Sequence, residues 1–208
     1  MTKEFQTGFS LAELAVVLVI VAVLSAGAIS TLRAQTERAR FAEARALNDE
    51  TRDALLNYAA VTGALPCPDI SFDGSQGNPA MCGTGVQHGW VPWKTLGLPK
   101  TDPWGQPLHY AVHPTFTKAT TIALDTKSTI GVQRQLADGS TELLGNADSV
   151  VMALWSSGPD ARSKTTGSPS NTVFAEAPDS DDVVTWLSRF VLVGRMLEAG
   201  RDVPQTVP

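Results

Sequence analysis

The 208-residue sequence is poor in the residues that nucleic-acid-binding proteins and many metalloenzymes depend on. It contains three histidines and two cysteines, and its 21 Asp and Glu outnumber its 16 Lys and Arg, for a formal net charge of −5. Nonspecific nucleic-acid binding needs clustered Lys and Arg to neutralise phosphates. We therefore expect no nucleic-acid partner.

Catalytic and cofactor motifs are also missing from the sequence. It has no G-x-S-x-G, no H-E-x-x-H and no P-loop. Ser156-Ser157-Gly158 has no base at an identifiable spacing, and the two cysteines have no nearby histidine to complete a zinc site. We expect the protein not to be an enzyme and to carry no certain cofactor.

What the chain does have is a long uncharged segment near its start. Residues 14–32 are 19 consecutive residues without a charge. As an α-helix they would span roughly 28 Å, close to the hydrocarbon thickness of a bilayer. A polar leader precedes this segment, and one carboxylate, Glu13, stands at its entrance. Because a charge near hydrocarbon is costly, Glu13 is best explained if it has a partner.

This N-terminal sequence resembles the cleavage and methylation motif of type IV prepilins and type II secretion pseudopilins. Gly8 corresponds to the last leader residue, Phe9 to the new N-terminus, and Glu13 follows four residues later. Ser10 stands where the family more usually has Thr, and Leu14 follows the Glu. The resemblance implies cleavage after Gly8 by a prepilin peptidase, methylation of the Phe9 amine, and pairing of Glu13 with that amine on a neighbouring subunit.

The resemblance implies a minor pilin or pseudopilin, a structural subunit of a type II secretion pseudopilus or of a type IV or competence pilus. Such a protein crosses the bacterial inner membrane once, with its head in the periplasm, and enters a filament after processing. Its partners would be other pilin or pseudopilin subunits, the prepilin peptidase, the inner-membrane assembly platform and membrane lipid.

Other interpretations of the same segment stay open. Ala26-Gly27-Ala28 looks like a signal-peptide cleavage site, which would release a soluble exported domain. An uncleaved signal anchor is the second alternative. It would suit a membrane-anchored periplasmic binding module with a Trp-rich ligand surface and no role in a filament.

The rest of the sequence predicts an α+β protein. Residues 33–62 contain no Pro or Gly and are rich in helix formers, so the helix should continue until Gly63. Alternating or β-branched segments predict strands, and residues 156–172 read as a polar loop. The expected strands are residues 108–112, 120–124, 129–135, 150–155 and 181–187, with turns at Asp138-Gly139 and Gly145-Asn146 and a short helix at 189–199.

Together with the resemblance, this pattern implies a pilin-like fold, in which a long N-terminal helix packs on a C-terminal antiparallel sheet. The expected divisions are a leader (1–8), a transmembrane helix (9–32), its amphipathic continuation (33–62), a Pro/Gly/Trp-rich region (63–107), a β head (108–200) and a tail (201–208).

The Pro/Gly/Trp-rich region contains both cysteines of the chain, Cys67 and Cys82. In an oxidising periplasm we expect them to form a disulfide. Asp102-Pro103-Trp104-Gly105 predicts a turn that leads into the first strand. Trp90, Trp93 and Trp104 could form a carbohydrate or base-stacking surface, but we expect them to pack the region onto the helix.

The resemblance also suggests a calcium site. Major pseudopilins bind calcium near the C-terminal end, and Ser157-Gly158-Pro159-Asp160 and Asp179-Ser180-Asp181-Asp182 resemble the sequences around that site. Oxygen ligands suit Ca²⁺. This chain lacks the Gly-rich linker of those proteins, and the alternative is a solvated acidic loop. The candidate ligands are Asp160, Asp179, Asp181 and Asp182.

Overall fold

A computed structural model describes residues 10–79, 82, 85–163, 165–168, 171–178 and 180–206 of the chain. The side chains of residues 25–31, 166–168, 171–173 and 175–176 lie outside that description. The chain forms two compact units, Met1–Arg40 and Phe41–Pro208, which are considered one at a time below.

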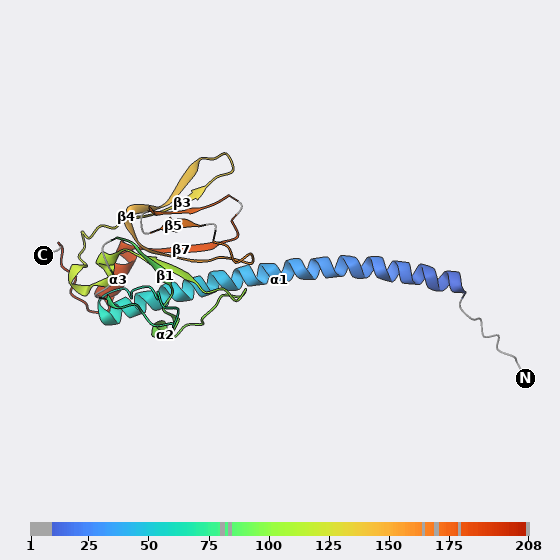
Figure 1. Cartoon of the computed structure of the whole chain (residues 1–208), viewed down its shortest axis with the longest axis horizontal. Helices are drawn as coiled ribbons and strands as arrows, with labels where there is room; N and C mark the ends of the chain where they lie inside the picture. Colours follow the sequence, from blue (N-terminus) through green and yellow to red (C-terminus); the bar gives the residue numbers. More distant parts are fainter. Residues whose placement is uncertain are drawn as a thin grey trace, which may run out of the picture. The chain divides into compact units, whose positions relative to one another are not determined.

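The longest element is helix α1 (Leu11–Thr62), whose 52 residues contribute to both units (Figure 1). The N–H of Glu13 donates to Ser10 Oγ at 3.2 Å, so Ser10 caps the first turn. The helix ends where Gly63 adopts a φ of +87°, which a residue with a Cβ rarely adopts. The predicted continuation of the helix to residue 62 is confirmed.

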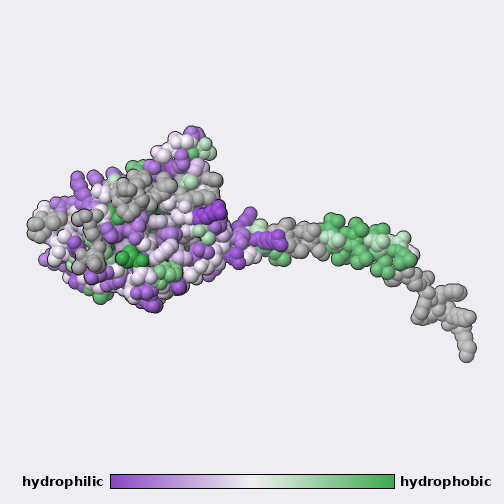
Figure 2. All heavy atoms as spheres, in the orientation of Figure 1, coloured by the Kyte–Doolittle hydropathy of each residue, from purple (hydrophilic) through white to green (hydrophobic). Residues whose placement is uncertain are grey.

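The first unit is helical, and its described side chains from residue 11 to residue 24 are all apolar except Glu13. All residues from 11 to 24 are exposed, and large apolar side chains account for most of that surface (green along the helix in Figure 2). Among the described residues, no helix has the length and hydropathy to cross a membrane. The side chains of residues 25–31, inside the predicted transmembrane segment, are outside this description.

The described residues of the second unit form a seven-stranded sheet with the order β1-β2-β4-β3-β6-β5, and β7 pairs with β4 (Figure 1). All its strand pairs are antiparallel except β3 with β6. The predicted α+β class with a mainly antiparallel sheet is therefore confirmed. The strands are β1 (Gln87–Trp90), β2 (His109–Val112), β3 (Ile130–Gln135), β4 (Thr141–Ser156), β5 (Thr166–Ser168), β6 (Asn171–Glu176) and β7 (Val183–Ser188).

Shorter helices complete the second unit. They are α2 (Trp93–Leu96), the 3₁₀ helices η2 (Pro114–Thr117) and η3 (Ala119–Thr121), and α3 (Arg189–Glu198). Ser188 caps α3, because its side chain accepts a hydrogen bond from Phe190 N. The helix predicted at residues 189–199 is thus confirmed to within one residue.

The core of the second unit lies on both faces of its sheet, because successive strand residues point to opposite sides. On one face, side chains of β2, β4 and β7 pack against the buried residues of α1, including Leu47, Leu55 and Ala59. Buried Asn48 also donates from Nδ2 to Val183 O at 2.8 Å, which joins α1 to β7. The opposite face is covered by a second cluster around Phe174.

Several local predictions were wrong. Residues 120–124 form no strand, because Thr121 Oγ1 donates to Thr115 O and Thr126 Oγ1 donates to Thr121 O, so side chains replace a strand ladder. The turn predicted at Gly145-Asn146 lies inside β4, where a Cβ on Gly145 would lie 2.6 Å from Val150 Cγ2 and 3.2 Å from Trp186 Nε1.

Other differences concern elements the sequence did not predict. The region 63–107 contains β1 and α2, and the polar loop 156–172 contains β5 and the start of β6. The turn at residues 102–105 is confirmed by the hydrogen bond from Gly105 N to Asp102 O at 3.0 Å, but it leads into β2 rather than the first strand. Buried Ser156 Oγ donates to Asp102 Oδ2 at 2.5 Å, which fixes this turn to the end of β4.

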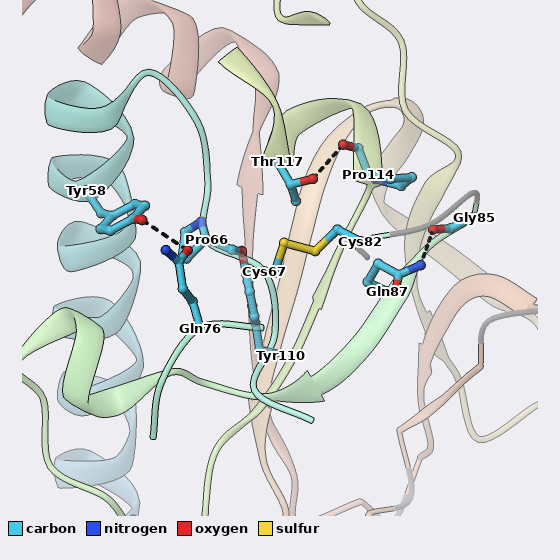
Figure 3. Close-up of a disulfide and its surroundings, with 10 residues drawn as sticks. All are labelled: Tyr58, Pro66, Cys67, Gln76, Cys82, Gly85, Gln87, Tyr110, Pro114 and Thr117. Atoms are coloured by element: carbon cyan, nitrogen blue, oxygen red, sulfur yellow. Dashed lines mark hydrogen bonds between the residues drawn. A yellow bond between two sulfur atoms is a disulfide. The ribbon is translucent and has the colours of Figure 1, made fainter. Parts of the chain in front are cut away.

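The predicted disulfide between Cys67 and Cys82 is confirmed, with the two Cα atoms 6.2 Å apart (Figure 3). Both cysteines are buried. Tyr58 Oη, on α1, donates to Gln76 Oε1 at 3.0 Å inside the closed loop. Tyr110 Oη, on β2, donates to Pro66 O at 3.2 Å, so the loop is held between helix and sheet.

Removing this disulfide should destabilise the second unit. Closing a loop of 15 residues in the unfolded chain is worth about 3 kcal/mol. We expect the double variant Cys67→Ala/Cys82→Ala to lose about that free energy of unfolding, measured by urea denaturation of the full chain in detergent. A reductant should destabilise the unmodified chain but not the variant, and equal sensitivity of both would contradict the assignment.

Candidate functional sites

Of the three residues predicted for processing and assembly, the structure describes one. Gly8 and Phe9 lie outside the described residues. Glu13 is exposed in the first turn of α1, where the helix dipole favours a carboxylate. Among the described residues its carboxylate has no ion-pair partner.

The predicted calcium ligands lie partly together. Asp160 N donates to Asp181 Oδ2 at 3.4 Å, and Gly158 permits this approach, since a Cβ there would lie 2.6 Å from Asp181 O. Asp182 is buried and accepts a hydrogen bond from Thr165 N at 2.6 Å.

The fourth predicted ligand, Asp179, lies outside the described residues. Among the described residues, no group of three or more His, Cys, Asp and Glu side chains is arranged to hold a metal ion. Asp181 and Asp182 accept these hydrogen bonds from backbone N–H groups of residues 160 and 165, and Asp160 accepts one from Arg162 N at 2.8 Å. The calcium site stays a prediction.

The tryptophans of the 63–107 region have different surroundings. Trp93 is buried beside Phe72, and Gly74 allows the loop to approach its indole. Trp104 packs edge-on against Phe41 of α1, with ring centroids 4.8 Å apart. Trp104 confirms the expected packing onto the helix, Trp93 packs within its own region, and half-buried Trp90 lines a cavity.

Trp90 belongs to a row of rings that crosses the sheet. It pairs directly with His109 on β2, and His109 pairs with Trp155 on β4. The ring centroids are 4.5 Å apart in the first pair and 5.0 Å in the second, where the rings are stacked at 6°. Trp155 continues to Phe174, which stacks on His88 at 5.3 Å. We call these five residues the aromatic row.

The aromatic row was missed in the sequence. The one available signal was the two-residue spacing of His88 and Trp90, which places both side chains on the same face if that segment is a strand. Their partners come from strands that are far away in the chain, so only the pairing register brings the rings together.

His109 is held neutral inside this row. Burial, and to a smaller extent the neighbouring His88, lowers the pKa of His109 from 6.5 to about 4. Its Nε2 lies 3.0 Å from the Oγ of buried Ser157, within hydrogen-bond distance. No pattern in the sequence predicts this pair, which ties β2 to the residue that follows β4.

A comparison of the chain with known protein families, with curated proteins and with solved structures finds no match.

The depressed pKa of His109 predicts a loss of stability in mild acid. As the pH falls from about 6.5 to about 4, the unfolded chain takes up a proton at this residue and the folded chain does not. The free energy of unfolding therefore decreases, by up to about 3 kcal/mol. We expect the stability difference between the unmodified chain and His109→Gln to shrink over this pH range in urea denaturation.

A matched control is His113→Gln. Burial also lowers the pKa of His113, but this ring packs edge-on against Phe116, outside the aromatic row. A difference between the unmodified chain and His109→Gln that stayed constant from about pH 7 to about pH 4.5 would contradict the assignment to His109.

Proposed function

We propose that the protein is a minor pilin or pseudopilin. In this proposal a prepilin peptidase cleaves the chain after Gly8, the new N-terminal amine of Phe9 is methylated, and α1 packs with the helices of other subunits in a filament. The second unit is the head. The observation that carries the proposal is the exposed apolar surface of α1 in the first unit, interrupted by the carboxylate of Glu13.

The exposed surface of this helix is too apolar to be left in water. Burying one Leu, Val or Ile side chain is worth about 1.5–3 kcal/mol. The described part of the first unit exposes a continuous series of them, so lipid or other apolar helices must cover it. Those exposed by half or more include Leu11, Leu14, Val16, Val17, Leu18, Val19, Ile20, Val21, Val23 and Leu24.

Glu13 adds a charge to this apolar surface, and that charge can select how a neighbouring helix packs against it. In the sequence Glu13 follows Phe9, whose amine cleavage would create, by four residues. In an apolar environment an unpaired carboxylate is costly, and a neighbouring subunit's amine would neutralise it. This pairing would set the register in which one helix packs against the next.

The disulfide and the apolar helix support the proposed location. A buried disulfide suits an oxidising compartment. We place the protein in a bacterial inner membrane with the second unit in the periplasm. Its partners there are other pilin or pseudopilin subunits, the prepilin peptidase and the assembly platform, and the filament is either a type II secretion pseudopilus or a type IV pilus.

A membrane-anchored binding module is the second candidate. The cavity beside Trp90 favours it, because a structural subunit has no need of one. This alternative requires the chain to keep Met1, whereas the filament proposal requires a chain that begins at Phe9.

The state of the N-terminus separates these candidates. Mass spectrometry of the protein from native membranes should find a chain that begins at methylated Phe9. In Gly8→Arg, a large charged side chain at the cleaved bond should block processing, so that only the chain beginning at Met1 is found. A native chain beginning at Met1 would support the anchored binding module, and one beginning at Ile29 would indicate a secreted soluble domain.

The role of Glu13 is tested by Glu13→Ala. We expect this variant to be cleaved normally but to enter filaments at least about tenfold less, because a subunit contact loses one partner of a buried charge pair. Immunoblots of sheared filaments against whole cells give the ratio. Glu43→Ala is the control, an exposed glutamate further along α1. Normal incorporation of Glu13→Ala would rule out the charge-pairing mechanism.

A further inference from the structure

A cavity of about 430 Å³ lies on the sheet face opposite α1, wholly within the second unit. Its volume falls in the range of about 300–1,000 Å³ that is typical of small-molecule sites. The rings of His88, Trp90, His109 and Trp155 from the aromatic row line it, and Ile70 adds an exposed apolar side chain. Neither the sequence resemblance nor the proposed filament role accounts for this cavity.

The aromatic row contains two indoles, those of Trp90 and Trp155, and Trp90 is the one that a ligand can contact. Trp155 is buried, and its Nε1 already donates to Ser163 Oγ at 2.7 Å. Trp90 is held by two backbone hydrogen bonds with Asp69, both of 2.9 Å, and remains half-buried. The cavity therefore presents a fixed, partly exposed aromatic surface to a flat apolar group.

A buried hydroxyl in the cavity wall has no hydrogen-bond partner in the part of the chain that the structure describes. Thr165 is 6% exposed, and among the described residues its Oγ1 forms no hydrogen bond. Its backbone N–H, by contrast, donates to Asp182. Because an unpaired buried hydroxyl costs free energy, a ligand that carries a donor or acceptor would be bound preferentially there.

The described residues that line the cavity provide few groups that could pair with a charged ligand. None of its described lining residues is Lys or Arg. Its carboxylate, Asp69, already accepts hydrogen bonds from Ser71 N and Oγ, Phe72 N and Gly74 N. His109 is uncharged at neutral pH, since burial lowers its pKa to about 4. A ligand here should be neutral, with an apolar flat side and polar edges.

We propose that this cavity binds the ring of a neutral sugar, with the C–H face of the ring on the Trp90 indole and a ring hydroxyl bonded to Thr165 Oγ1. A pyranose combines the apolar face and the polar edge that the cavity requires. A phenylalanine side chain of a partner protein would fill the same space but would leave Thr165 Oγ1 unpaired, and a tyrosine side chain would offer a single hydroxyl where a pyranose offers several. The sugar can be a free monosaccharide or the terminal residue of a glycan.

Saturation-transfer NMR on the full chain tests this proposal. The protein is kept in a detergent without a sugar headgroup, because a maltoside or glucoside would compete for the site. The probes are glucose, galactose, mannose and N-acetylglucosamine, each as free sugar and as methyl glycoside. For ligands of this size we expect a Kd on the order of 1 mM for at least one of them. Binding of the glycoside alone would identify a glycan end as the source.

Two variants assign the binding to the cavity. Trp90→Ala should weaken it about fivefold or more by removing the stacking surface. Thr165→Val keeps the shape of the side chain and removes the hydroxyl, so it should weaken binding by a similar factor without lowering the thermal stability of the protein. Trp104→Phe is the control, because Trp104 packs on Phe41 outside the cavity and its replacement should leave binding unchanged.

The proposal is wrong if none of the sugars shows saturation transfer, or if binding survives in Thr165→Val and Trp90→Ala at its original strength. If Trp90→Ala does not fold, Thr165→Val decides alone. N-acetyltyrosinamide serves as a further probe, and its binding in the absence of sugar binding would assign the cavity to a protein side chain instead. None of these results depends on whether the chain is cleaved at Gly8. Failure of the sugar-binding proposal can therefore be distinguished from failure of the filament proposal.

Discussion

The second unit depends on the burial of one face of α1 against its sheet. Leu47, Leu55 and Ala59 share that face and pack against apolar side chains of β2, β4 and β7. Apolar burial is the main favourable term in folding, and a sheet with one uncovered apolar face is not stable in water. Apolar contacts have no preferred direction, so the hydrogen bond from Asn48 to Val183 of β7 helps to fix how the helix is oriented on the sheet.

The helix covers one face of the sheet, and the aromatic row lies on the other face. Small residues on this face, Ala111 and Ala153, sit between larger rings and leave room for Phe174. The aromatic row then orders the edge of the sheet at β1 and borders the cavity. The disulfide loop supports β1 from outside, since Asp69 forms a bridge with Trp90 only two residues after Cys67.

The two units differ in how far their apolar side chains are exposed to solvent. In the second unit the large apolar side chains are mostly buried, while in the first the described apolar side chains are exposed along the helix (Figure 2). A subunit proposed to leave a membrane for a filament needs this division, because its helix must be transferable between lipid and neighbouring helices while its head stays folded. Glu13 is the one described charge among residues 11–24, and it is where specificity can reside.

The sequence by itself determined the features that depend on local chemistry. The absence of Pro and the scarcity of Gly fixed the long helix to Thr62, the two cysteines had only each other to pair with, and Asp102 to Gly105 could form only a turn. Strands such as β2 and β7 were also predictable, since their β-branched and aromatic residues favour extended backbone.

Tertiary structure alone decided the rest, because the contacts involved join distant segments. Residues 120–124 have strand-like composition, yet hydrogen bonds with Thr115 and Thr126 hold them in turns. Gly145 looks like a turn residue, but it lies inside a strand, where Val150 and Trp186 leave no room for a side chain. The aromatic row and the Ser157–His109 pair exist only because strand register brings their residues together, and no local pattern encodes that register.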